Sequence, residues 1–157
     1  MTLLEVQGIV KQFGGLTAVN DFSLSLDRGD IVGLIGPNGA GKTTAFNVIA
    51  GFYRPNSGRV RFGGRDITGL RPDQICKLGL ARTFQVVRPF GALSVLENVM
   101  IGAYARTNDK ATAKAKAEEA LEALGMTGLA ERAARDLPIA GRKRLEIARA
   151  LATEPQL

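Results

Sequence analysis

The stretch that decides the fold reads Gly36-Pro37-Asn38-Gly39-Ala40-Gly41-Lys42-Thr43, a full match to the pattern G-x-x-x-x-G-K-[S/T]. Glycines at these positions let the backbone curl, so that successive N–H groups point inward and form a concave site for an anion. Lys42 supplies a mobile positive charge for the β- and γ-phosphates, Thr43 a hydroxyl for Mg²⁺, and Thr44 a further phosphate contact. The sequence therefore predicts a nucleoside triphosphate site.

The segments on either side of this loop support that interpretation. Residues 31–35 are wholly apolar and predict a short strand buried on both faces. Residues 42–50 predict a helix that Gly51 ends. Alternation, capping patterns and glycine stops predict the other elements: a hairpin of residues 3–11 and 17–26, strands at 59–62 and 80–84, and helices at 72–78, 94–104, 110–124 and 142–152.

The composition excludes several kinds of protein. Among 157 residues, 45% are hydrophobic and 23% charged, which is typical of a globular domain rather than a disordered chain. We find no secretory signal and no apolar run of the roughly 18 residues that span a membrane. The single cysteine, Cys76, fits a reducing compartment, and the lack of histidine excludes Ser-His and Cys-His catalysis. The net charge of +6 favours acidic partners such as nucleotide, nucleic acid or an anionic membrane surface.

The loop alone does not name the base or the reaction. The sequence contains no Asn-Lys-x-Asp motif for reading guanine, so a GTPase is disfavoured. A small-molecule kinase, a recombinase-type ATPase and an ATP-binding cassette remain open on the loop alone.

Three features resemble the motifs of ATP-binding cassette (ABC) proteins. Residues 36–44 resemble the Walker A loop of that family. Residues 11–14 resemble its A-loop, whose aromatic residue stacks on adenine, a role that falls to Phe13. Residues 81–85 resemble the Q-loop, and this resemblance implies that Gln85 is a ligand of Mg²⁺ or of the attacking water.

A fourth feature is the run 142–151, which resembles the helix after the family's Leu-Ser-Gly-Gly-Gln signature. Aligned without a gap, the signature falls on Leu137 and the four residues that follow it, Pro138, Ile139, Ala140 and Gly141. In the family, this motif clamps the γ-phosphate of ATP held by the opposite subunit. Pro138 lacks the serine hydroxyl, so we expect a clamp built only from backbone donors at a helix N-terminus.

The run from Gly79 to Val99 resembles the LivG-like ATPase subunits of branched-chain amino acid importers, and the resemblance extends over essentially the whole chain. It implies an α/β fold of the P-loop NTPase (ABC ATPase) type. The expected parts are an antiparallel β-subdomain with the P-loop core (residues 1–85), a helical subdomain (86–140) and the signature helix (141–157), with the RecA-like core incomplete at the C-terminus.

The resemblance also implies a function. The chain is expected to bind ATP and Mg²⁺ at the inner face of the cell membrane, with hydrophobic permease subunits and a second ATPase subunit in a head-to-tail dimer as partners, and no nucleic acid. The family's Walker B aspartate, catalytic glutamate and switch histidine find no counterpart, so we expect a cassette cut before these residues that hydrolyses ATP poorly. The alternatives are a soluble ABC-type ATPase acting on nucleic acid and a non-hydrolysing nucleotide-binding fragment.

Overall fold

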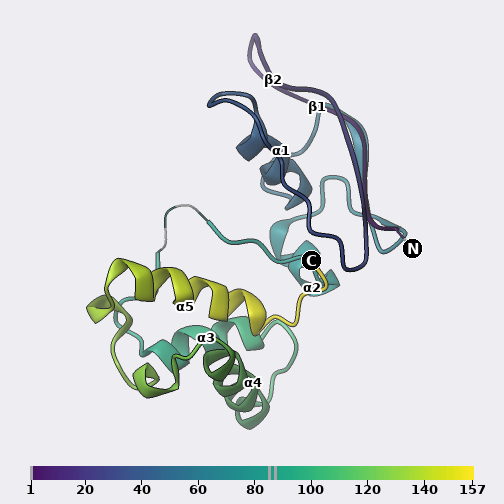
Figure 1. Ribbon diagram of the computed structural model, residues 1–157. Helices are drawn as coiled ribbons and strands as arrows, with labels where there is room; N and C mark the ends of the chain where they lie inside the picture. The colour runs from purple at the N-terminus through teal and green to yellow at the C-terminus, as the bar shows by residue number, and fades with distance from the viewer. Residues whose placement is uncertain (1, 85, 87) are drawn as a thin grey trace. The chain divides into compact units, whose positions relative to one another are not determined.

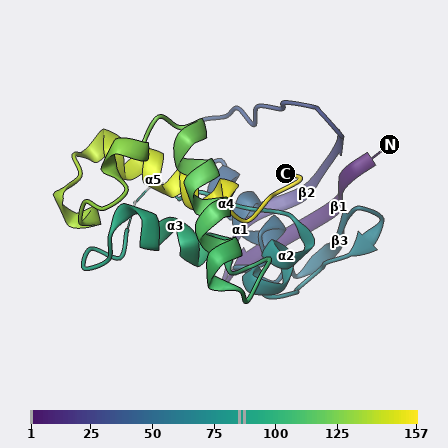
Figure 2. The same ribbon diagram turned by 90° about the horizontal axis from the view of Figure 1, so that it is seen from below.

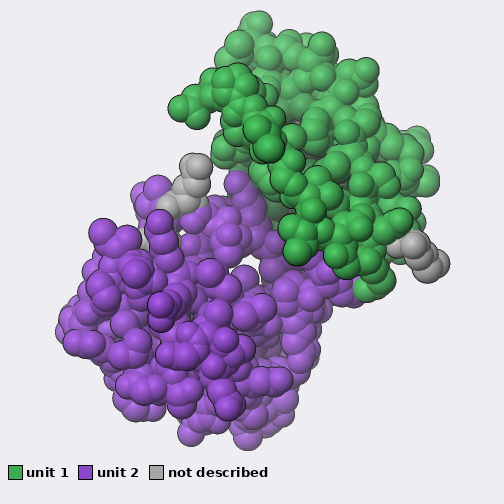
Figure 3. Space-filling model, in the orientation of Figure 1, with its two compact units in different colours: residues 1–75 green, residues 76–157 purple. Residues whose placement is uncertain are grey.

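A long antiparallel hairpin begins the chain, formed by β1 (Thr2–Phe13) and β2 (Leu16–Asp27) (Figure 1). The computed structural model describes residues 2–84, 86 and 88–157, which divide into two units, residues 1–75 and 76–157 (Figure 3). The predicted hairpin is confirmed, because Phe13 pairs with Leu16 across a two-residue turn. Along β2, Leu26 is buried while its neighbours Ser25 and Asp27 are exposed, which is the alternation that the sequence predicts.

The hairpin is extended into a four-stranded antiparallel sheet of order β2-β1-β3-β4, with β3 (Ser57–Phe62) beside β1 and the short β4 (Arg65–Asp66) at the edge. The predicted strand at 59–62 is therefore confirmed. Helix α1 (Lys42–Ile49) contacts β1 and β2 and confirms the helix predicted after the glycine-rich loop. The core of this unit is formed by apolar side chains from the sheet and the helix: Leu4, Val6, Ile9, Ala45, Val48, Val60 and Phe62.

The prediction of a buried strand at residues 31–35 is wrong. These residues form no strand, and Ile31 and Ile35 have relative exposures of 101% and 95%. A strand needs hydrogen-bonding neighbours, and no described strand pairs with this segment. Its apolar side chains alone therefore do not hold it in a sheet.

The prediction of a strand at residues 80–84 is also wrong, although the start of this described segment pairs with Leu157. The N–H of Leu157 donates to the carbonyl of Gly79 at 3.2 Å, and the N–H of Ala81 donates to the carbonyl of Leu157 at 2.8 Å. This is the bonding pattern of neighbouring parallel strands around Leu80, which is buried. The pairing extends over too few residues to form a strand.

Helices make up most of the second unit. Its helices α3 (Val95–Ala103), α4 (Lys110–Ala123) and α5 (Ile139–Leu151) pack on one another (Figure 2). Helix α2 (Pro72–Leu78), which spans the boundary between the two units along the chain, has the predicted bounds. Two short 3₁₀ helices, η1 (Thr127–Leu129) and η2 (Ala134–Asp136), connect α4 to α5. Their common core is apolar and includes Val95, Val99, Ala113, Ala117, Leu121, Leu145 and Ala148. None of the helices described here is long and apolar enough to cross a membrane.

Helix starts show how well local signals work in this unit. At α3 the predicted capping box is confirmed: the N–H of Glu97 donates to Ser94 Oγ at 3.1 Å, and the N–H of Ser94 donates to Glu97 Oε2 at 2.8 Å. The predicted start of α5 at Arg142 is wrong by three residues, since the helix begins at Ile139 with Pro138 as its N-cap. Proline fixes φ near the helical value, so it can precede the first turn without strain.

Candidate nucleotide-binding site

The glycine-rich loop runs directly into α1 and lies against β2. Gly39 and Gly41 have φ angles of +85° and +83°, and the Gly41 carbonyl accepts the N–H of Ala45 at 2.8 Å. A Cβ at Gly41 would lie 2.1 Å from the carbonyl oxygen of Ala18 on β2. Only glycine fits that position, because a side chain would meet both the unfavourable φ and the neighbouring backbone.

Lys42 lies within the curve of this loop. Its Nζ donates to the carbonyl oxygens of Gly36 at 2.5 Å and Pro37 at 2.6 Å. The positive charge therefore lies beside the curled backbone, where an anion gains from both the ammonium and the N-terminal end of α1. Among the other residues predicted to contact nucleotide, Asn38, Ala40 and Thr43 are exposed and Thr44 is half-buried.

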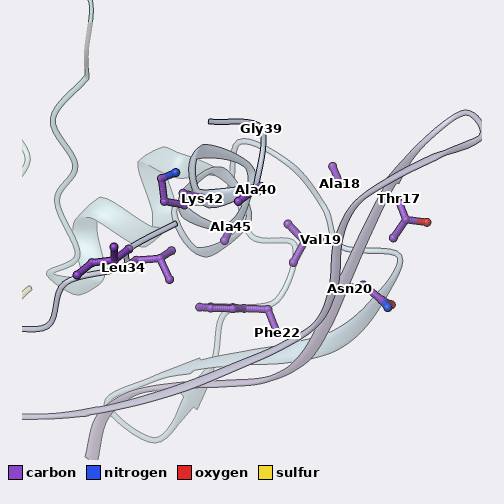
Figure 4. A pocket seen from close by; sticks show the side chains of 12 residues that line it. Thr17, Ala18, Val19, Asn20, Phe22, Leu34, Gly39, Ala40, Lys42 and Ala45 are labelled. Carbon is purple, nitrogen blue, oxygen red and sulfur yellow. The ribbon is translucent and has the colours of Figure 1, made fainter. Parts of the chain in front are cut away.

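A pocket of about 400 Å³ lies between β2 and this loop (Figure 4). Val19 and Phe22 line it from β2, and Ala40, Lys42 and Ala45 line it from the loop and α1. Its volume is in the range of small-molecule sites. The pocket combines an apolar wall with one cationic group, Lys42, at the phosphate loop.

Phe13 lies at the end of β1, outside the residues that line this pocket. It pairs with Leu16, whose neighbour Thr17 is a lining residue. Phe13 is 42% exposed, and its ring and that of Tyr53 meet edge to face, with centroids 5.1 Å apart and an interplanar angle of 78°. Lys11 Nζ lies 5.0 Å from the centre of the Phe13 ring. Sequence reasoning missed Tyr53, since no local pattern relates the segment after α1 to the end of β1. It placed Lys11 in the A-loop motif but gave it no role of its own.

The Q-loop residue Gln85 lies outside the described residues, but the segment before it contacts α5. The N–H of Phe84 donates to Glu146 Oε1 at 2.5 Å. Two motifs that the sequence analysis treated separately, residues 81–85 and 142–151, are thus joined within the second unit. Burial lowers the pKa of Arg149 on the same helix, and its guanidinium lies 5.1 Å from the ring of Phe90.

The signature segment forms the start of α5. Pro138 is the N-cap and makes no side-chain capping bond, while Ile139, Ala140 and Gly141 occupy the first turn. Ile139 is 75% exposed. The side chain of Arg142 binds the residues that precede the helix: its Nε donates to the Leu137 carbonyl at 2.9 Å and its Nη2 to the Arg135 carbonyl at 2.8 Å. This segment offers first-turn N–H groups to a ligand, without a hydroxyl.

The side chains of the site also indicate how Mg²⁺ could be held. Within the described part of the chain, no group of three or more His, Cys, Asp or Glu side chains could hold a metal ion by itself. Mg²⁺ bound with a nucleotide takes most of its ligands from phosphate oxygens and water, with one or two from the protein. The exposed hydroxyl of Thr43, next to Lys42, fits that requirement.

Comparisons with known proteins identify the family and the fold. Residues 19–157 match the family described as ABC transporter. The branched-chain amino acid transport ATP-binding protein LivG of Salmonella typhimurium is 40% identical over 99% of this chain and 67% of its own length. BraF of Pseudomonas aeruginosa, also named as a branched-chain amino acid transport ATP-binding protein, is 38% identical over the same shares. The ADP conformation of the ATP-binding cassette MJ1267 superposes with a TM-score of 0.86 at 37% identity, over 99% of this chain and 66% of that one. The chain thus spans about two thirds of the length of the proteins that it matches.

Proposed function

The chain belongs to the ABC transporter family, and we propose that it is the ATP-binding subunit of an importer of branched-chain amino acids, in which ATP binding and hydrolysis drive transport. The observation that carries the proposal is the position of Lys42 inside the curled loop at the start of α1. The names of the relatives, which are 38% and 40% identical, supply the solute class.

The proposed site uses one group of residues for each part of the nucleotide. Backbone N–H groups of Gly36 and of residues 38–41 bind the phosphates together with the ammonium of Lys42, and Thr44 adds a further contact. Thr43 and Gln85 hold Mg²⁺, which neutralises charge on the phosphate oxygens. Phe13 stacks on the adenine ring.

The proposed partners are hydrophobic permease subunits and a second ATPase subunit in a head-to-tail dimer at the inner face of the membrane. In that dimer, Pro138, Ile139, Ala140 and Gly141 contact the ATP held by the other subunit. The exposure of Ile139 and the first turn of α5 support this part of the proposal, because the segment is accessible to a second chain.

A titration with the fluorescent nucleotide mant-ATP tests the phosphate site. Replacing Lys42→Ala removes charge-assisted bonds to phosphate and should weaken binding about tenfold or more. The matched control is Lys110→Ala, which removes an exposed lysine at the start of α4 and should leave affinity unchanged. Unchanged affinity in Lys42→Ala would refute the site.

A chimera tests the transport function separately. In the chimera, residues 1–157 replace the matching part of Salmonella LivG. It is expressed in Salmonella cells from which LivG has been deleted, and leucine uptake is measured. Uptake that depends on Lys42 supports the proposal. A chimera that binds mant-ATP normally but restores no uptake contradicts the assignment to branched-chain amino acid import while leaving the nucleotide site intact.

A further inference from the structure

We propose that Tyr53 is a positioning residue that orients the ring of Phe13 and so sets the part of nucleotide affinity that depends on the base. This inference rests on the proposed stacking role of Phe13. It concerns a residue that the sequence motifs do not include.

The first observation is the geometry of the ring pair. The centroids of Phe13 and Tyr53 are 5.1 Å apart at an angle of 78°, which is the edge-to-face arrangement that aromatic quadrupoles favour. Phe13 is the last residue of β1 and is 42% exposed. A side chain this exposed is only partly enclosed by its neighbours, so its contact with the ring of Tyr53 restricts its orientation.

The second observation is that residues 52–56, the segment that contains Tyr53, are hydrogen-bonded to the rest of the unit at both ends. The N–H groups of Phe52 and Tyr53 donate to the carbonyl of Asn47 near the end of α1, at 2.8 and 3.2 Å. Further along, the N–H of Asn56 donates to the Val10 carbonyl at 2.8 Å, and the N–H of Gln12 donates to Asn56 Oδ1 at 2.8 Å. The segment is therefore tied to α1, whose other end carries Lys42, and to the end of β1 that carries Phe13.

Lys11 completes this support. Its Nζ donates to the Arg54 carbonyl at 2.9 Å and lies 5.0 Å from the centre of the Phe13 ring and 5.9 Å from that of Tyr53. A cation at these distances is attracted to both rings. The hydrogen bond fixes the ammonium beside the pair, so the pair is held by contacts from two chain segments.

A ring held in place before binding does not have to be ordered when the base arrives, and this lowers the entropic cost of stacking. The phosphates gain nothing from it, because they contact a different group of residues. Tyr53 should therefore affect ATP and leave inorganic tripolyphosphate unaffected.

Calorimetric titration of the whole chain with ATP and with tripolyphosphate tests this. Tyr53→Leu should weaken ATP binding about fivefold and leave tripolyphosphate binding unchanged, since it removes the edge-to-face contact but keeps apolar bulk. Tyr53→Phe keeps the ring and should bind ATP as the unaltered chain does. The matched control is Tyr104→Leu, which replaces an exposed tyrosine at the end of α3 and should change neither affinity.

The outcomes separate this inference from the proposed function. If Phe13→Ala leaves the ratio of ATP to tripolyphosphate affinity unchanged, the stacking role of Phe13 is wrong and the inference falls with it. If Phe13→Ala lowers the ratio but Tyr53→Leu does not, only the positioning role is overturned. An equal loss of both ligands in Tyr53→Leu also overturns it, because that result indicates damage to the phosphate loop.

A spectroscopic measurement covers the case in which Tyr53→Leu fails to fold. The chain has two tyrosines and no tryptophan, so Tyr104→Phe leaves Tyr53 as the single emitter. ATP should change the emission of Tyr53, after correction for absorption by the nucleotide, and tripolyphosphate should not. Emission that responds to neither ligand, or equally to both, overturns the inference.

Discussion

Helices α1 and α5 both begin at segments assigned to nucleotide contacts, yet their starts are built in different ways. The start of α1 has glycines at positive φ, a close approach to the β2 backbone and a lysine inside the curve. The start of α5 has Pro138 as an N-cap without a capping bond and an exposed Ile139. The first carries its own charge and curvature and can select an anion by itself. The second offers only N–H groups and the helix dipole, and in the proposed dimer it contacts ATP that the other subunit holds.

The largest effect is expected from Gly41→Ala, which attacks the close approach at α1. The new Cβ would lie 2.1 Å from the Ala18 carbonyl oxygen at a φ of +83°. Strain and displacement together should lower the free energy of unfolding by about 3 kcal/mol or more and abolish mant-ATP binding. Urea unfolding and nucleotide titration measure both effects. Gly39→Ala is the control, since it has a similar φ but nothing within 4 Å. Equal losses in the two variants would show that the approach of Ala18 is unimportant.

Ser94→Ala measures how much a side-chain cap stabilises a helix start. Helix α3 has such a cap, and α5 does not. This change removes the hydroxyl that accepts the N–H of Glu97 at 3.1 Å. The free energy of unfolding should fall by about 1 kcal/mol, the usual value of an N-cap. Urea denaturation measures it, and Ser25→Ala, at an exposed strand position, is the control. A loss no larger than that of the control contradicts the assignment of a stabilising capping box.

Gly141→Ala, at the start of α5, is the counterpart of Gly41→Ala at the start of α1. Its effect on the free energy of unfolding should have the opposite sign. The nearest atoms to a Cβ there are Leu137 Cβ and Pro138 Cδ at 3.4 Å, and no positive φ requires glycine. Alanine should raise the free energy of unfolding by about 0.5 kcal/mol, because it is less flexible in the unfolded chain. Thermal unfolding measures the gain. A loss as large as that in Gly41→Ala would mean that the two starts are equally constrained.

The smallest effect concerns pH at the start of α4, which is capped by a carboxylate. Asp109 Oδ2 accepts from the Thr112 hydroxyl and from the Thr112 N–H, both at 2.7 Å, and these bonds hold the pKa of Asp109 below its ordinary value of 3.8. Because the folded pKa is the lower one, the contribution to stability is complete above 3.8 and is lost as the pH falls through the folded value. Asp109→Asn keeps a cap without this titration, so unfolding curves below pH 3.8 should depend less on pH in the variant. Identical pH dependence in both chains contradicts the role of Asp109.

Local signals explain which parts of the fold were predicted. Pro72 and Gly79 mark the ends of α2, and the Ser94–Glu97 pair marks the start of α3, because the interactions involved span only a few residues. The sequence also predicts strands at the apolar run 31–35 and at residues 80–84, and both predictions are wrong. A strand is completed by hydrogen bonds to another segment, and neither run has enough of them among the described residues.

The sequence alone determined the phosphate loop, its lysine, the helix that follows it and the missing hydroxyl of the signature segment, since each depends on residue types at fixed short spacings. Only the tertiary structure decided that Ala18 lies behind Gly41, that Phe84 meets Glu146 and that the ring of Tyr53 contacts the ring of Phe13. These contacts join segments far apart along the chain, and no short-range pattern encodes them. The first contact depends on the position of β2 in the hairpin, the second on the packing of α5 within its own unit, and the third on the segment after α1 returning along β1.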